Sequence, residues 1–161
     1  MFTIFFKGAQ LTNEDHDTLI ATAAAFYTME QTRLYKTTCK NHDLVALIQG
    51  QEVSFSISQS ETGYAIKFLD SGRELSLQGD FSQWDKVSNI KTSTNSGIET
   101  VQLISKTYDD TFRIRYKGTA LNVSLTPQHV ALFKKHIKEK PKLDVSKGTW
   151  PMSSLDLTAV C

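Results

Sequence analysis

The sequence has few residues of the kinds that mark a secreted, metal-binding or membrane-spanning chain. Only two cysteines, Cys39 and Cys161, occur among its 161 residues, too few and too far apart for a disulfide framework or a zinc site. No stretch approaches the roughly 20 consecutive apolar residues that a membrane-spanning helix needs. The apolar start of the chain is too short for a signal peptide and lacks a basic leading region. We therefore expect an intracellular chain with free thiols and no membrane partner.

An excess of charge of one sign is also missing. Lysine and arginine total 18, and aspartate and glutamate total 17, whereas dedicated nucleic-acid binders carry a large basic excess. Two local basic stretches occur, Phe112–Lys117 and Lys134–Lys138. We interpret them as the solvent-facing sides of a strand and a helix, because no aromatic residues for base stacking lie on the same faces. The sequence thus predicts no nucleic-acid partner.

No combination of residues typical of a catalytic or metal centre is present. Cys39 and His42 are near neighbours, but a nucleophilic Cys–His pair also needs an oxyanion hole, which nothing nearby supplies. The glycines are isolated, so they form no phosphate-binding loop. The four histidines are scattered without the spacing of metal ligands: His16, His42, His129 and His136. We predict no catalytic, cofactor-binding or metal-binding residues.

What the sequence does contain begins with a long helix. Thr12 is a good N-cap, and Asp15 follows three residues later, as in a capping box. Arg33 and Lys36 lie toward the other end, where positive charge suits the helix dipole. We predict a helix from about Thr12 to about Thr37. Its middle, Leu19–Met29, is apolar on nearly every side, which indicates that other structure surrounds it.

After Asp43 the apolar period changes from helical to alternating. Strict alternation of apolar and polar residues predicts strands with one dry and one solvated face. The clearest segments are Val53–Ser58, Tyr64–Phe68, Leu75–Leu77, Phe112–Lys117 and Leu121–Leu125. Glycine-containing turns separate such segments at Gln49-Gly50, Ser71-Gly72, Ser96-Gly97 and Lys117-Gly118. Short turns of this kind join antiparallel strands.

The predicted helix and the predicted strands each have apolar surface that the other can bury. A one-sided sheet must cover its dry face, and a helix that is apolar all round must be enclosed. We predict an α+β fold: an antiparallel β-barrel of about eight strands wrapped round the long N-terminal helix. A second, shorter C-terminal helix follows, with Thr126 as its cap, Pro127 at its first position and Pro141 ending it. Its apolar stripe, Val130, Phe133 and Ile137, predicts that it lies on the surface of the core.

Several segments, in this order and spacing, are similar to one known family. They are Phe6-Lys7-Gly8 before Leu11-Thr12 and the alanine-rich helix, Trp84, Ile98–Ser105, Phe112–Leu125 with its Tyr116–Thr119 turn, and Ala131-Leu132-Phe133. From about Phe6 to about Lys140 the chain resembles the BT domain of propionyl-CoA carboxylase alpha subunits, which connects biotin carboxylase to carboxyltransferase. The resemblance implies a BT-like docking domain over residues 1–143 and an irregular tail over residues 144–161.

The sequence departs from the family beyond this region. Family members continue into a biotinyl domain, whereas here Trp150-Pro151-Met152 is followed by Ser153-Ser154. The Met-Lys-Met motif that carries biotin and the ATP-grasp biotin carboxylase are both absent from this sequence. The resemblance therefore implies no cofactor in this chain, biotin and ATP being those of full-length family members. It implies no enzyme activity for the chain alone, only a part in an ATP- and biotin-dependent ligase complex.

The function implied by the resemblance is a docking scaffold. Its partners would be the carboxyltransferase (beta) subunit and the biotin carboxylase domain, in the mitochondrial matrix of a eukaryote. In the family, the central helix and the hook-like loop after it make the contacts. Carried over to this sequence, the contact residues are Leu34, Tyr35, Lys36, Thr38, Cys39, Lys40, Asn41 and His42.

Two alternatives stay open. One is the same module from a methylcrotonyl-CoA carboxylase, which the loop sequence does not separate from the propionyl type. The other is a stand-alone barrel that binds a small ligand, for which a deep apolar pocket with convergent polar groups would speak. The apolar helix argues against such a barrel, because it would fill the interior.

Overall fold

The computed structural model describes residues 10–36, 41–81 and 86–137, and its first element is helix α1 (Asn13–Tyr35). The helix begins as predicted, with a capping box in which the Asp15 carboxylate accepts a hydrogen bond from Thr12 N at 2.9 Å. In return, the Thr12 hydroxyl accepts one from Asp15 N. The helix ends at Lys36, which has a left-handed φ of 48°. These local signals set both ends of α1.

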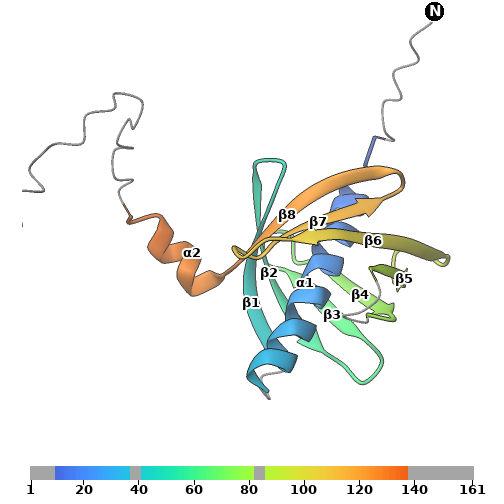
Figure 1. Ribbon diagram of the computed structural model, residues 1–161, viewed down its shortest axis with the longest axis horizontal. Coiled ribbons are helices and arrows are strands. Elements are labelled where there is room, and N and C mark those ends of the chain that lie inside the picture. Colours follow the sequence, from blue (N-terminus) through green and yellow to red (C-terminus); the bar gives the residue numbers. More distant parts are fainter. Residues whose placement is uncertain (1–9, 37–40, 82–85, 138–161) are drawn as a thin grey trace, which may run out of the picture.

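Eight antiparallel strands follow and close into a barrel (Figure 1). They are β1 (Asn41–Ile48), β2 (Gln51–Gln59), β3 (Tyr64–Phe68), β4 (Glu74–Gly79), β5 (Val87–Thr92), β6 (Ile98–Lys106), β7 (Thr111–Tyr116) and β8 (Thr119–Pro127). Each strand pairs with the next along the chain, and β8 pairs with β1 to close the sheet. The predicted α+β barrel is therefore confirmed.

Two of the predicted glycine turns show why the strands reverse so tightly. Between β1 and β2, Gln49 and Gly50 have φ of 48° and 80°. Between β7 and β8, Lys117 and Gly118 have φ of 48° and 79°. Positive φ at both central residues is typical of the two-residue hairpin turn whose twist matches that of the flanking strands.

Helix α1 occupies the interior of the barrel (Figure 1). Every residue from Thr18 to Thr28 is buried, which confirms the prediction that other structure surrounds this segment. The alanines let the wall approach closely. The Phe26 ring meets the Phe81 ring edge to face, with ring centroids 5.3 Å apart. The buried threonines satisfy their hydroxyls by donating to the carbonyl four residues earlier, as Thr22 does to Thr18 O at 2.8 Å.

The C-terminal helix α2 (Gln128–Lys134) differs from the prediction in its start and its packing. Thr126 does not cap it but lies in β8, paired with Val45 of β1, and the N-cap is Pro127 without a side-chain cap. The predicted apolar stripe of this helix does not pack on the core, because Phe133 is 68% exposed and Ile137 is 67% exposed. Because α1 already fills the barrel, this stripe has no core to join, and α2 projects to one side of the barrel (Figure 1). The predicted stop at Pro141 lies outside the described residues.

Candidate docking surface

The C-terminal end of helix α1 projects from the barrel. Its burial stops after Thr28, and the residues from Thr32 to Lys36 are exposed. Leu34 is 52% exposed and Tyr35 is 67% exposed. We call this open end of the barrel, beside the start of β1 and the β6–β7 turn, the exit end. An exposed leucine and tyrosine on a helix held by a buried stem form a candidate contact surface.

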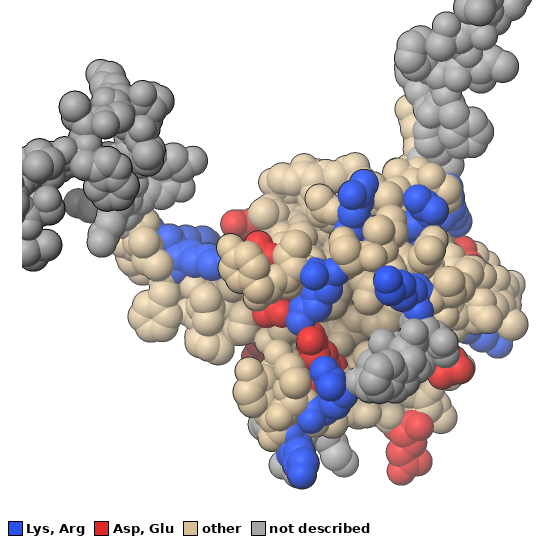
Figure 2. All heavy atoms as spheres, viewed as in Figure 1, with Lys and Arg blue, Asp and Glu red and all other residues tan. Residues whose placement is uncertain are grey.

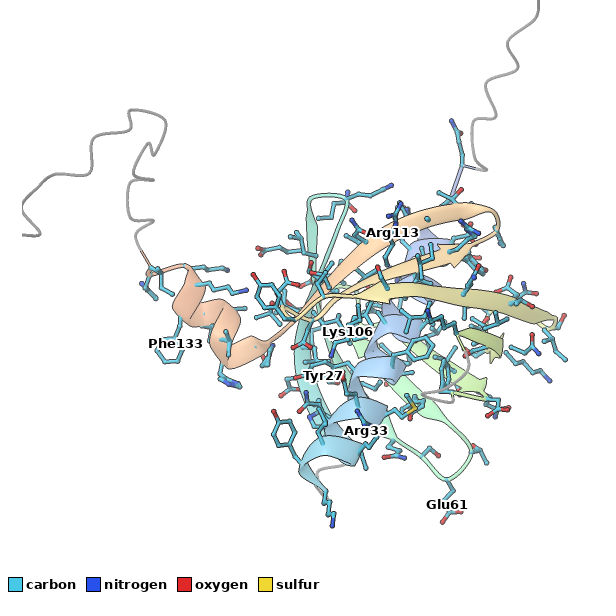
Figure 3. The ribbon with its side chains drawn as sticks, in the orientation of Figure 1. Tyr27, Arg33, Glu61, Lys106, Arg113 and Phe133 are labelled. Atoms are coloured by element: carbon cyan, nitrogen blue, oxygen red, sulfur yellow. The ribbon has the colours of Figure 1, made fainter. Side chains whose placement is uncertain are left out.

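A charged cluster holds α1 to the wall at the exit end. The Lys106 ammonium pairs with the Glu30 carboxylate and lies 3.1 Å from Asp110 Oδ1. It also lies over the Phe112 ring, 5.5 Å from the ring centroid. Partial burial by itself lowers the pKa of Lys106, but the two carboxylates raise it more, so the net pKa lies above the ordinary value. Figure 3 shows Lys106 beside the half of α1 that carries Tyr27 and Arg33.

The start of β1 lies next to the same part of the helix. The His42 ring meets the Tyr27 ring edge to face, with centroids 6.4 Å apart. Burial raises the pKa of Tyr27, and the nearby Asp110 carboxylate raises it further. A pocket of about 360 Å³ opens here, lined by Tyr27, Asn41, His42, Asp43, Leu44, Pro127, Gln128 and His129. The exit end therefore combines a projecting helix with an adjacent open pocket.

The structure places part of the predicted contact set at the exit end. Leu34, Tyr35 and Lys36 form the exposed last turn and cap of α1. Asn41 and His42 were predicted to lie in the loop, and this was wrong. They are the first two residues of β1, because they pair with the end of β2. Thr38, Cys39 and Lys40 lie outside the described residues. The described members of the set therefore share one end of the barrel.

Sequence reasoning missed the residues that hold this surface. Lys106 and Glu30 are separated by 76 positions, so no local pattern connects them. Tyr27 was taken only as part of the apolar middle of the helix, whereas its ring also borders the pocket at the exit end. The one available signal was an acidic residue, Glu30, directly after the apolar middle of the helix, because a carboxylate that is partly buried needs a partner.

At the opposite end of the barrel, α1 is fixed by other ion pairs. Arg73, from the turn between β3 and β4, lies 2.7 Å from Asp17 Oδ2. Lys117, from the turn between β7 and β8, lies 2.6 Å from Asp15 Oδ1. Burial raises the pKa of Asp17 more than Arg73 lowers it, so the net pKa lies above the ordinary value. Both turns thus bind the first turns of the helix.

A second exposed apolar surface lies on α2 and beside it. A groove of about 430 Å³ runs between α2 and the outer faces of β1, β2 and β8. Its lining includes Leu47 and Leu132, which are 44% and 57% exposed. Phe133, labelled in Figure 3, is also exposed, but it does not line this groove and lies on another face of α2. Large exposed apolar side chains that gather in one place are typical of contact sites.

The charges of the outer wall do not gather into a patch of one sign. On the face drawn in Figure 2, basic and acidic side chains are interspersed. Along β7, Arg113 and Arg115 are exposed and alternate with the buried Phe112 and Ile114. This alternation supports the interpretation of the basic stretch as the solvated face of a strand. No group of three potential metal ligands occurs among residues 10–36, 41–81 and 86–137, and neither described helix is long and apolar enough to cross a membrane.

The fold is that of a barrel filled by its own helix, with Leu34 and Tyr35 exposed on the projecting helix end. Residues 19–140 match the family model described as the propionyl-coenzyme A carboxylase BT domain. The chain therefore belongs to the BT domain family. A comparison with curated proteins found no match. Membership implies a connecting, non-catalytic role in a biotin-dependent carboxylase.

Proposed function

We propose that this chain docks the carboxyltransferase (beta) subunit of a propionyl-CoA carboxylase through the exit end of its barrel. The observation that carries the proposal is the projecting end of α1, on which Leu34 and Tyr35 are more than half exposed. Tyrosine is enriched among the residues that dominate binding at protein interfaces. His42, the last residue of the contact set implied by the family resemblance, lies beside the same part of the helix through its ring contact with Tyr27.

The buried stem of α1 supports this role. The segment from Thr18 to Thr28 is enclosed by the wall, so the direction in which the helix leaves the barrel is set before a partner arrives. A surface that is ordered in advance loses less conformational entropy on binding, which favours affinity. The filled interior also argues against the stand-alone ligand-binding barrel, since α1 takes the space that a ligand would need.

A connector must contact two partners, and the described residues offer two separate apolar surfaces. We assign the exit end to the carboxyltransferase subunit, and the α2 surface to the biotin carboxylase domain. By the α2 surface we mean the exposed apolar side chains of α2 and the residues after it, Leu132, Phe133 and Ile137, together with Leu47 across the groove from Leu132. Separate surfaces allow both partners to bind at once. The biotin arm then moves between two active sites held at a fixed spacing, which raises its effective concentration at each.

In this proposal the chain itself binds neither biotin nor ATP, and the ligase chemistry belongs to the partner domains. In a eukaryote the complex would work in the mitochondrial matrix. The methylcrotonyl-type carboxylase is the neighbouring possibility, and its beta subunit provides the comparison. Preferential binding of one beta subunit over the other identifies the carboxylase to which the module belongs.

The test is co-elution of the full chain with a propionyl-CoA carboxylase beta subunit on size exclusion. Wild type should co-elute, whereas a variant with Thr38 to His42 replaced by glycine and serine, and a Leu34→Ser/Tyr35→Ser variant, should elute alone. Ile98→Ser is the matched control, because Ile98 is 77% exposed but lies at the opposite end of the barrel. Failure of the folded wild type to bind either beta subunit would refute the proposed docking role.

A further inference from the structure

The enclosed segment of α1 is rich in small side chains. Four alanines, Ala21, Ala23, Ala24 and Ala25, are fully buried within its enclosed segment. Small side chains offer few directional contacts of their own, and the larger Phe26 and Tyr27 contact the wall before the helix leaves it. Directional contacts must therefore contribute to fixing how far the projecting end is turned.

The directional contacts occur at both ends of the helix. Asp15 and Asp17 pair with turns at the opposite end of the barrel, and Glu30 pairs with Lys106 at the exit end. Beyond Thr28 the helix loses its enclosing wall, so the Glu30 pair is the contact nearest to the exposed turn among the ion pairs described. This pair therefore joins the helix to the wall within one turn of Leu34.

Lys106 is itself well anchored. Besides Glu30 it contacts Asp110 and the Phe112 ring, so three different groups fix its ammonium. The backbone carbonyl of Asp110 accepts a hydrogen bond from Leu125 N of β8 at 3.0 Å, which ties the turn to the wall. The side chains of Lys106 and Glu30 are only 27% and 24% exposed, so solvent screens their pairing less than that of a surface pair.

The position of Glu30 on the helix connects the pair to the docking surface. Leu34 lies four residues after Glu30, so the two side chains are neighbours on one helix face, one turn apart. Tyr35 is the next residue along the chain. A rotation that moved Glu30 away from Lys106 would turn Leu34 by the same angle and displace Tyr35 with it.

We propose that Lys106 is a positioning residue for partner docking: by bridging Glu30 and Asp110 it fixes the rotation of the last turns of α1 and so aims Leu34 and Tyr35 at the partner. This inference rests on the proposed docking function. Lys106 lies behind the contact surface and acts through the helix. Its loss should leave the enclosed core intact, because Thr18–Thr28 remains buried and both ion pairs at the opposite end persist.

The test compares full-length variants in two measurements. Lys106→Met keeps a side chain of similar length but removes its positive charge, and Lys106→Arg retains a cation. Glu30→Gln removes the negative charge on the helix. Lys67→Met is the control, because it breaks the Lys67–Glu74 pair on the outer wall, whose side chains are 57% and 73% exposed. The measurements are titration with the propionyl-CoA carboxylase beta subunit and amide hydrogen exchange of residues 29–36 and 18–28.

We expect Lys106→Met and Glu30→Gln to weaken binding about tenfold and to speed exchange only in residues 29–36. Lys106→Arg and Lys67→Met should behave as wild type. If Lys106→Met fails to fold, Glu30→Gln carries the test. Wild-type affinity in the folded Glu30→Gln variant, or unchanged exchange in residues 29–36, would overturn the inference. Failure of the wild type to bind refutes the docking function instead, and the exchange result still decides whether the pair positions the helix end.

Discussion

The ammonium of Lys117 lies 2.6 Å from Oδ1 of Asp15, across 102 positions of sequence, and this contact joins the β7–β8 turn to the first turn of α1. The other carboxylate oxygen of Asp15 accepts hydrogen bonds from the backbone and the hydroxyl of Thr12. One side chain therefore both caps the central helix and attaches it to the wall. The stability of the barrel should respond to changes at this position.

The pH dependence of stability should report this contact. Burial by itself raises the pKa of Asp15, but the hydrogen bonds from Lys117 and Thr12 lower it more, so the folded pKa lies below the ordinary 3.8. The unfolded state then binds more protons, so this contribution is present above pH 3.8 and is lost as the pH falls through the folded pKa. Urea unfolding between pH 3 and pH 7 should show a smaller acid-induced loss for Lys117→Met than for wild type. An equal loss of unfolding free energy in the two proteins would contradict a stabilising contact between Lys117 and Asp15.

Phe26→Asp tests the enclosed helix. Phe26 is 3% exposed and contacts the Phe81 ring, so the substitution buries a carboxylate without a partner. We expect a loss of several kcal/mol, enough to unfold a domain of ordinary stability. Phe133→Asp is the matched control, since Phe133 is 68% exposed and should tolerate the charge with little change in stability. An unchanged thermal midpoint for Phe26→Asp, followed by circular dichroism, would mean that the helix is not enclosed.

Gly63, just before β3, should not tolerate a side chain. A Cβ at this position would overlap the backbone carbonyl oxygen of Leu77 in β4, and backbone within a paired strand cannot move aside easily. We expect Gly63→Ala to cost about 1–3 kcal/mol of unfolding free energy. In Gly97→Ala, the control, the new Cβ would meet no atom closer than the Asn95 Oδ1 at 3.7 Å, so stability should stay near wild type. Equal urea midpoints for both variants would contradict the close approach of Gly63 to β4.

The α2 surface can be separated from the exit end by a single substitution. Phe133→Ser should leave the melting temperature within about 1 °C of wild type, because exposed side chains add little to stability. It should weaken binding of a biotin carboxylase domain while leaving the beta subunit bound, as measured in parallel titrations. Tyr35→Ser should show the reverse pattern. Loss of both partners in either variant would mean that the two surfaces do not act separately.

Much of the fold could be predicted because its signals are local. The capping box at Thr12, the turn at Gln49-Gly50 and the alternation in β2, β3, β7 and β8 all depend on neighbouring residues. Strand β5 was not predicted. Its inward positions, Ser88, Ile90 and Thr92, include two hydroxyl residues, which hide the apolar alternation.

The candidate site was predictable only in part. The resemblance pointed to the end of α1, and the structure shows that Leu34 and Tyr35 are exposed there. The contact role of these residues stays a prediction, as it does for Thr38, Cys39 and Lys40. The pocket beside Tyr27 and the bridge formed by Lys106 could not be predicted, because their members come from segments far apart in the chain.

The sequence by itself determined the order of elements, the ends of α1 and the alternation of the strands, since helix caps, turns and side-chain period act over a few residues. Tertiary structure decided where α2 begins and what it covers. Pairing of β8 with β1 closes the barrel, and these hydrogen bonds keep Thr126 in the strand against its local tendency to cap a helix. With α1 filling the interior, the apolar side chains of α2 have no core to join. The start of α2 and its exposure therefore depend on hydrogen bonds between distant strands and on α1 filling the barrel. Neither can be seen in the local sequence pattern.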